Sequence, residues 1–336
     1  MTIREIATLA GVSPAAVSLV INGKKGVSEE TRRRVTEIIV ENGYHIAGKR
    51  KHEERFRLMV IKYRAHGIAL EENQGFIASI IDRIESECRR HDFDLMMCNC
   101  EARNAAETIR DLMTKEPRGV ILIGTELREE DYGLLSLFTV PTVVLDNLIV
   151  RPGVDCVVMD NRNLMRQTVR YLYGLGHRDI GYFRFTQPVS NCDDRYRGYL
   201  EEMAALGLEP RKTVLLKPTL DGAYTDMLEL IRSGQYVPSG AAVADNDTVA
   251  IGAMKAIAES GYRIPEDLSI TGFDDIPFSA VTSPGLTTMR ISRSAMGSLA
   301  VNMIRQRVKH PDWPEMRMLI GGKLIERGSA RRTGEA

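Results

Sequence analysis

From residue 57 onward, short apolar runs alternate with amphipathic helical stretches, and the alternation passes through two series. The runs of the first series are 58–63, 93–98, 120–123 and 142–145, and those of the second are 156–159, 180–183, 213–216, 241–244 and 268–272. Helical periodicity covers 75–91, 104–115, 129–138, 161–176, 194–206, 222–233 and 247–260. Strands that alternate with helices form parallel sheets. Two series therefore predict a two-lobed α/β body, whose ligand binds between the lobes at the carboxyl ends of the strands.

The first 57 residues differ from this body in charge. They hold 11 Lys and Arg against 7 Asp and Glu, whereas the whole chain of 336 residues balances 45 against 45. A basic head on an acidic body fits a polyanionic partner, although such an imbalance also arises by chance.

The cysteines indicate a reducing compartment, because their number is odd and their spacing irregular. They are Cys88, Cys98, Cys100, Cys156 and Cys192. Cys98 and Cys100 would share one face of a strand without a second pair at zinc spacing, so we expect buried thiols, no metal and no cofactor. No apolar run approaches the roughly 18 residues of a membrane span, and Arg4 and Glu5 interrupt any signal peptide. We therefore expect a cytoplasmic protein.

The head predicts three short helices. Thr2 can cap the first, Gly11 turns the chain, and Ser13 and Pro14 begin the second as N-cap and first helical residue. A third helix follows Ser28 and ends near Asn42 and Gly43. Two short helices joined by a tight turn form a helix-turn-helix, although the same pattern also occurs in plain helical bundles.

The residues of the head resemble the DNA-binding domain of the lactose/galactose repressor (LacI/GalR) family. The resemblance lies in residues 3–18, Asn22-Gly23, 27–32 and 41–44. It implies that the second helix enters the major groove of operator DNA, with Pro14, Ala15 and Leu19 towards the bases. These apolar side chains can read only thymine methyl groups and shape. The other DNA-binding candidates, most of them suited to phosphates, are Thr2, Arg4, Ser13, Ser18, Asn22, Lys24, Lys25 and Arg32.

The body resembles the same family. The matching stretches are 159–161, 174–177, 195–199, 244–252, 265–275, 284–288 and 324–329. The resemblance implies a periplasmic-binding-protein fold with chain crossings near 158, 288 and 320. It implies effector binding by Arg195, Asn246 and Asp274, each at a strand or helix end, and by the ring of Phe76. Arg195 and Asp274 could instead form a structural ion pair between the lobes, and Phe76 could be a core residue.

Catalytic motifs fit the sequence poorly. Gly174-Leu175-Gly176 ends a helix instead of following a strand, so it is no dinucleotide loop. No nucleophile elbow, P-loop or His-Glu-x-x-His motif occurs. We therefore expect a dimeric transcriptional regulator, most simply a repressor, with a small-molecule effector such as a sugar. The rivals are a free-standing sugar-binding protein, which would lack the helix-turn-helix, and an enzyme on the same fold.

We expect a head at 1–45, a linker at 46–57 and a body at 58–329. Within the body, the expected first lobe is 58–157 with 289–319 and the second is 159–287 with 320–329. The linker departs from the family, whose relatives carry a Pro-Asn pair and a short hinge helix with a groove-inserting leucine. Here Gly48 weakens any helix, and Lys49, Arg50 and Lys51 suggest an arm along the DNA, with a plain solvated linker as the alternative. Helices 75–91 and 247–260 are expected to form a two-fold interface, and the tail lacks the leucine heptads of a tetramer.

Overall fold

The computed structural model describes residues 2–21, 24–41, 56–68, 75–211 and 213–334. These fall into two compact units, residues 1–55 and 56–336. In these residues no single helix is long and apolar enough to cross a membrane, although α1 (Ile3–Ala10) and α2 (Pro14–Ile21), bent by 105°, reach that length and composition together.

The head consists of three helices, α1 (Ile3–Ala10), α2 (Pro14–Ile21) and α3 (Glu29–Glu41). The Thr2 hydroxyl accepts a hydrogen bond from the Glu5 N–H while the Glu5 carboxylate accepts from the Thr2 N–H, which forms a capping box. Gly11 adopts the left-handed conformation (φ +65°) that ends α1 and turns the chain into α2. The small core that joins the helices comprises Ile6, Ala7, Ala10, Val17, Ile21 and Val35.

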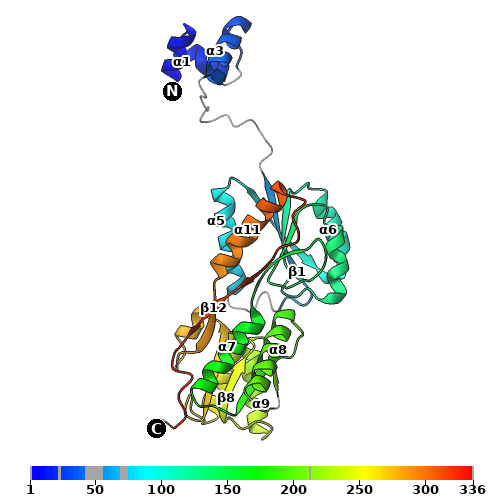
Figure 1. The fold of residues 1–336 in the computed structure, drawn as a ribbon, viewed down its shortest axis with the longest axis vertical. Coiled ribbons are helices and arrows are strands. Elements are labelled where there is room, and N and C mark those ends of the chain that lie inside the picture. The colour runs from blue at the N-terminus through cyan, green and yellow to red at the C-terminus, as the bar shows by residue number, and fades with distance from the viewer. Residues whose placement is uncertain (1, 22–23, 42–55, 69–74, 212, 335–336) are drawn as a thin grey trace. The chain divides into compact units, whose positions relative to one another are not determined.

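The body contains two six-stranded sheets (Figure 1). The first has the order β11-β5-β4-β3-β1-β2 and all its strand pairs are parallel. The second has the order β12-β10-β9-β8-β6-β7, with only β12 antiparallel to its neighbour. The strands of the first sheet are β1 (Arg57–Arg64), β2 (Asp94–Glu101), β3 (Gly119–Ile123), β4 (Thr142–Leu145), β5 (Asp155–Met159) and β11 (Arg317–Ile320). Those of the second are β6 (Ile180–Phe185), β7 (Val214–Leu216), β8 (Gly240–Ala244), β9 (Leu268–Asp274), β10 (Thr287–Ile291) and β12 (Gly322–Ile325).

Helices cover both sheets, as continuous burial of parallel strands requires. Figure 1 shows α5 beside α11 on the first sheet and α7 beside α8 on the second. The helices are α5 (Phe76–Arg90), α6 (Ala105–Met113), α7 (Asn161–Gly174), α8 (Ser190–Ala205), α9 (Leu220–Arg232), α10 (Asp247–Glu259) and α11 (Arg293–Lys309). Three short 3₁₀ segments are η1 (Ala102–Asn104), η2 (Glu129–Leu137) and η3 (Pro277–Ala280).

The chain crosses between the sheets three times, after β5, after β10 and between β11 and β12. The second crossing lies near Ser292 and not near 288, because β10 runs to Ile291 and pairs with both β9 and β12. The predicted helix at 129–138 is also wrong. This segment forms a 3₁₀ helix instead; Gly133 interrupts it, and its apolar residues, among them Tyr132, Leu134 and Leu137, are only partly buried against the core.

Candidate functional site

The exposed start of α2 is the candidate DNA-reading surface. The Ser13 hydroxyl accepts a hydrogen bond from the Ala16 N–H at 3.1 Å, so it is engaged in capping the helix. Pro14 and Ala15 follow in the first turn and are exposed, whereas Val17 is buried in the head core. This surface therefore offers methyl and methylene groups and no side-chain hydrogen-bond donor in its first two positions.

Charged groups flank this helix. Arg4, Lys24 and Lys25 are exposed, and the Arg32 guanidinium donates to the Lys24 carbonyl oxygen at 2.7 Å. Arg32 therefore ties α3 to the segment after α2. Leu19 is half-buried. Its side chain lies close to Gly26, since a Cβ added to that glycine would be 3.4 Å from Leu19 Cδ1. Ser18 is half-buried and Thr2 caps α1. The candidates Asn22, Lys49, Arg50 and Lys51, and the predicted helix end at Asn42-Gly43, lie outside the described residues.

A pocket between the two sheets of the body brings together all four predicted effector residues, Phe76, Arg195, Asn246 and Asp274. Its free cavity volume is only about 30 Å³, so the lining side chains nearly close it and a sugar-sized ligand would require the lobes to move apart. Phe76 is the first residue of α5, Asn246 caps α10, and Asp274 ends β9. Arg195 does not lie at a helix end as predicted, because α8 begins four residues earlier than expected, at Ser190.

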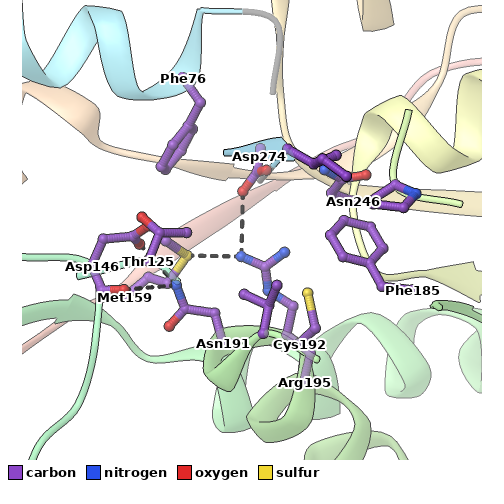
Figure 2. Close-up of a pocket in the computed structure, with 13 residues that line it drawn as sticks. Phe76, Thr125, Asp146, Met159, Phe185, Asn191, Cys192, Arg195, Asn246 and Asp274 are labelled. Carbon is purple, nitrogen blue, oxygen red and sulfur yellow. Dashed lines mark hydrogen bonds and ion pairs between the residues drawn. The ribbon is translucent and has the colours of Figure 1, made fainter. Parts of the chain in front are cut away.

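Arg195 is the centre of the pocket's polar network (Figure 2). Its Nε donates to Asn161 Oδ1 at 2.8 Å, and Nη1 donates to the carbonyl oxygen of Asp245. Nη2 lies 3.0 Å from Met159 Sδ and 3.5 Å from Asp274 Oδ1. The guanidinium also stacks on the ring of Phe273 at 3.8 Å. A fully buried cation is thus held in one orientation.

The structure bears differently on the alternative roles of the Arg195–Asp274 pair and of Phe76. Arg195 and Asp274 do form an ion pair, but α8 and β9 belong to the same lobe, so the pair does not bridge the lobes. The Phe76 ring is 1% exposed and lines the pocket as well, with the Arg293 guanidinium 5.8 Å from its centroid. Its packing and a ligand-facing position are therefore compatible.

Further bonds across the cleft come from residues that sequence reasoning missed. Asn191, on α8, donates through Nδ2 to Asp146 Oδ1 at 2.9 Å and to the Asp146 carbonyl oxygen at 3.0 Å. Thr125 donates to the other Asp146 oxygen at 2.6 Å, and Asn161 donates to Asn191 Oδ1 at 2.9 Å. A continuous network therefore joins the ends of β3 and β4 to α8 and Arg195.

Burial sets the electrostatics of this network. Burial raises the pKa of the Asp146 carboxyl to about 6, against the opposing effect of its hydrogen bond from Thr125. Burial likewise raises the pKa of Asp245 to about 6, although Tyr182 and the Phe185 N–H both donate to it. The Cys192 thiol also lines the pocket, and burial raises its pKa well above the ordinary value, so it is no activated nucleophile.

A positive φ marks the end of β9. Asp274 has φ +107° and Asp275 has φ +53°, conformations that non-glycine residues adopt at a cost. Both are held by arginines, since Arg293 donates to their carbonyl oxygens and Arg290 and Arg327 bind the Asp275 carboxylate. This strained turn fixes the Asp274 carboxylate at the pocket.

Comparison with known proteins finds a matching family model in each of the two units. Residues 2–46 match the bacterial regulatory proteins of the lacI family, and residues 169–330 match the periplasmic binding protein-like domain. The chain is 30% identical to the HTH-type transcriptional repressor PurR of Pasteurella multocida, over 98% of each chain. The chain belongs to the LacI family. It is also 29% identical to the ribose operon repressor of Haemophilus influenzae, over 93% of each chain.

Solved LacI-family structures share the fold. A transcriptional regulator CelR–cellobiose complex superposes with a TM-score of 0.71 at 25% identity, covering 98% of this chain and 99% of that one. The lac repressor dimer bound to operator and the anti-inducer ONPF gives 0.73 at 22% identity with the same coverage. This LacI-family member is therefore a DNA-binding transcriptional regulator with an effector-binding body, and it is not an enzyme.

Proposed function

We propose that this regulator is a repressor that binds its operator as a homodimer and that a sugar in the pocket around Arg195 controls it. The single observation that carries the effector role is the network from Thr125 through Asp146 and Asn191 to Arg195, because it crosses from one lobe to the other. A ligand that contacts this network on both sides would change the equilibrium between lobe arrangements. The ring of Phe76 offers a flat face for a sugar ring, and the carboxylate of Asp274 accepts hydroxyl hydrogen bonds.

The roles of individual DNA-binding residues are part of the proposal. Pro14, Ala15 and Leu19 would contact base edges through apolar atoms, and the flanking Arg4, Lys24 and Lys25 would hold phosphates. The basic run Lys49, Arg50 and Lys51 would follow the DNA as an arm. A regulator that acts on chromosomal operators would work in the cytoplasm.

The proposed domain boundaries place the head at 1–45, the linker at 46–57 and the body at 58–329.

The dimer contact would use α5 and α10. Two large apolar side chains are exposed nearby: Phe278, in η3, is 51% exposed, and Val281, directly after η3, is 76% exposed. The neighbouring segment 282–284 lines a groove with Ile251 and Met254 of α10. A second copy would cover this apolar surface, and the lac repressor dimers of the same fold support that arrangement. Light scattering at micromolar protein should give twice the 37.6 kDa chain mass, and a monomer or tetramer mass would contradict it.

Gel shifts with fragments of the genome that encodes the protein test the regulatory proposal. A few fragments should be retained in the presence of excess unrelated DNA, and ribose, cellobiose or another sugar should change their retention. Retention of all fragments alike would contradict a sequence-specific regulator. A free-standing sugar-binding protein would bind a sugar and retain no fragment.

A further inference from the structure

The charges that surround the effector pocket are mainly negative. Asp146 and Asp274 line it directly, and Asp245 and Asp247 are completely buried on either side of Asn246. Among the lining residues that the structure describes, Arg195 is the one cation.

The guanidinium of Arg195 is already engaged. Its Nε, Nη1 and Nη2 all have partners in the protein, its charge is opposed by Asp274 3.5 Å away, and one face is covered by Phe273. A phosphate or carboxylate that paired with this arginine would compete for its charge with the Asp274 carboxylate.

The next cation cannot substitute for it. Arg293 donates to the carbonyl oxygens of Asp274 and Asp275 from outside the lining, and its guanidinium carbon lies 5.8 Å from the centroid of the Phe76 ring. An anion in the pocket would therefore lose its hydration without gaining a counter-charge, which is expensive in a buried site. Burial, and to a smaller extent the charge of Asp274, raises the pKa of Asp247 to about 7 and that of Asp146 to about 6.

We infer that the effector of this regulator carries no negative charge, and that the pocket accepts a neutral polyhydroxylated molecule while excluding its phosphate and its acid. The inference rests on the proposed function, because it assumes that the effector binds in this pocket. The carboxylates of Asp146 and Asp274 suit hydroxyl donors, which bind carboxylates without adding charge. The rings of Phe76 and Phe185 cover apolar faces of such a ligand.

Isothermal titration of the full-length protein with matched ligands tests this inference. The ligands are ribose, glucose, galactose and cellobiose, each compared with its phosphate and with the acid obtained by oxidising one carbon. The methyl ester of each acid restores neutrality at nearly equal size. A sugar that binds should lose at least about tenfold in affinity as the phosphate or acid, since one unit charge near two carboxylates is strongly repelled. The ester should recover most of that loss.

Two variants locate the effect. Asp146→Asn removes one carboxylate from the pocket and should reduce the discrimination against anions several-fold. Asp194→Asn, on the same helix as Arg195 but outside the lining, should change it little. A phosphate or acid that binds as tightly as its neutral parent, and whose binding Asp274→Ala abolishes, would overturn the inference while leaving the pocket intact. Binding that is identical in wild type, Asp146→Asn and Asp274→Ala would instead overturn the proposed pocket itself.

Discussion

The proposed DNA-reading surface on α2 and the proposed effector pocket of the body differ in the polarity and burial of their side chains. The first turn of α2 exposes Pro14 and Ala15, two small apolar side chains on one continuous helix. The pocket is lined by buried charged and amide side chains, such as those of Arg195, Asp274 and Asn191, which come from segments far apart in the chain. We therefore expect the head to depend on shape and on surrounding phosphate contacts, and the pocket to depend on a network of hydrogen-bonded buried side chains.

This difference determines how each region should respond to substitution. An exposed side chain on α2 can be replaced without disturbing the head core, so its effect appears in DNA binding alone. A pocket residue shares its hydrogen bonds with its neighbours, so its loss affects effector binding through the whole network. Substitutions on α2 should therefore reduce operator binding without affecting effector binding, and substitutions in the pocket should reduce effector binding without affecting operator binding. The following variants test this.

The largest effect is expected from Ala15→Asp on α2. A carboxylate at this exposed position would approach the phosphates and base acceptors of the operator, and like charges in such a contact cost several kcal/mol. Operator affinity, measured by fluorescence anisotropy, should fall by about a hundredfold or more. Ala15→Ser is the matched control and should retain binding within several-fold. Equal operator affinity in Ala15→Asp and wild type would place α2 outside the groove.

A smaller loss is expected from Asp274→Ala in the pocket. Removing a charged hydrogen-bond partner should weaken effector binding by about 1.5–3 kcal/mol, roughly tenfold to a hundredfold. Operator affinity without effector should stay within about twofold. Because Asp274 also opposes Arg195, thermal unfolding should be followed beside binding, and Arg195→Ala should give the same loss of response. Variants that respond to effector like the parent would show that the site assignment is wrong.

The sequence predicted the arrangement of elements better than the composition of the pocket. The strands were identifiable because parallel strands are buried on both faces and read as apolar runs, as β3 and β9 are. The α-helix predicted at η2 was wrong because the segment contains Gly133 and its apolar residues are only partly buried. Four pocket residues could be named because they match family positions.

The remaining pocket residues had a weaker signal. Thr125 and Asp146 line the pocket just after the ends of β3 and β4, where ligands of parallel sheets bind, so their positions could have been proposed. The same holds for Asn161, which follows β5 and supports Arg195 from outside the lining. Asn191 was missed because the polar start of α8 does not read as a helix. Met159 and Cys192 read as core residues, and only the assembled fold shows that they also line the pocket.

The smallest effect at a fixed salt concentration is expected from the linker, replaced as Lys49→Ala, Arg50→Ala and Lys51→Ala together. If these residues neutralise phosphates, the slope of log affinity against log salt should flatten by about two to three units with little change in sequence preference. The operator should be bent little by the wild type, as circular-permutation gel shifts would show. An unchanged slope, or a sharp central kink, would contradict the arm.

Selection of bound sequences from random duplex DNA by the full-length protein tests the account most directly. Two heads on a two-fold dimer should enrich a pseudo-palindrome whose half-sites carry the sequence preference. Its affinity should then change when a neutral sugar that binds wild type is added, and not in Asp274→Ala. A pool without an enriched motif, or a motif with a single half-site, would contradict the proposed dimeric, effector-controlled repressor.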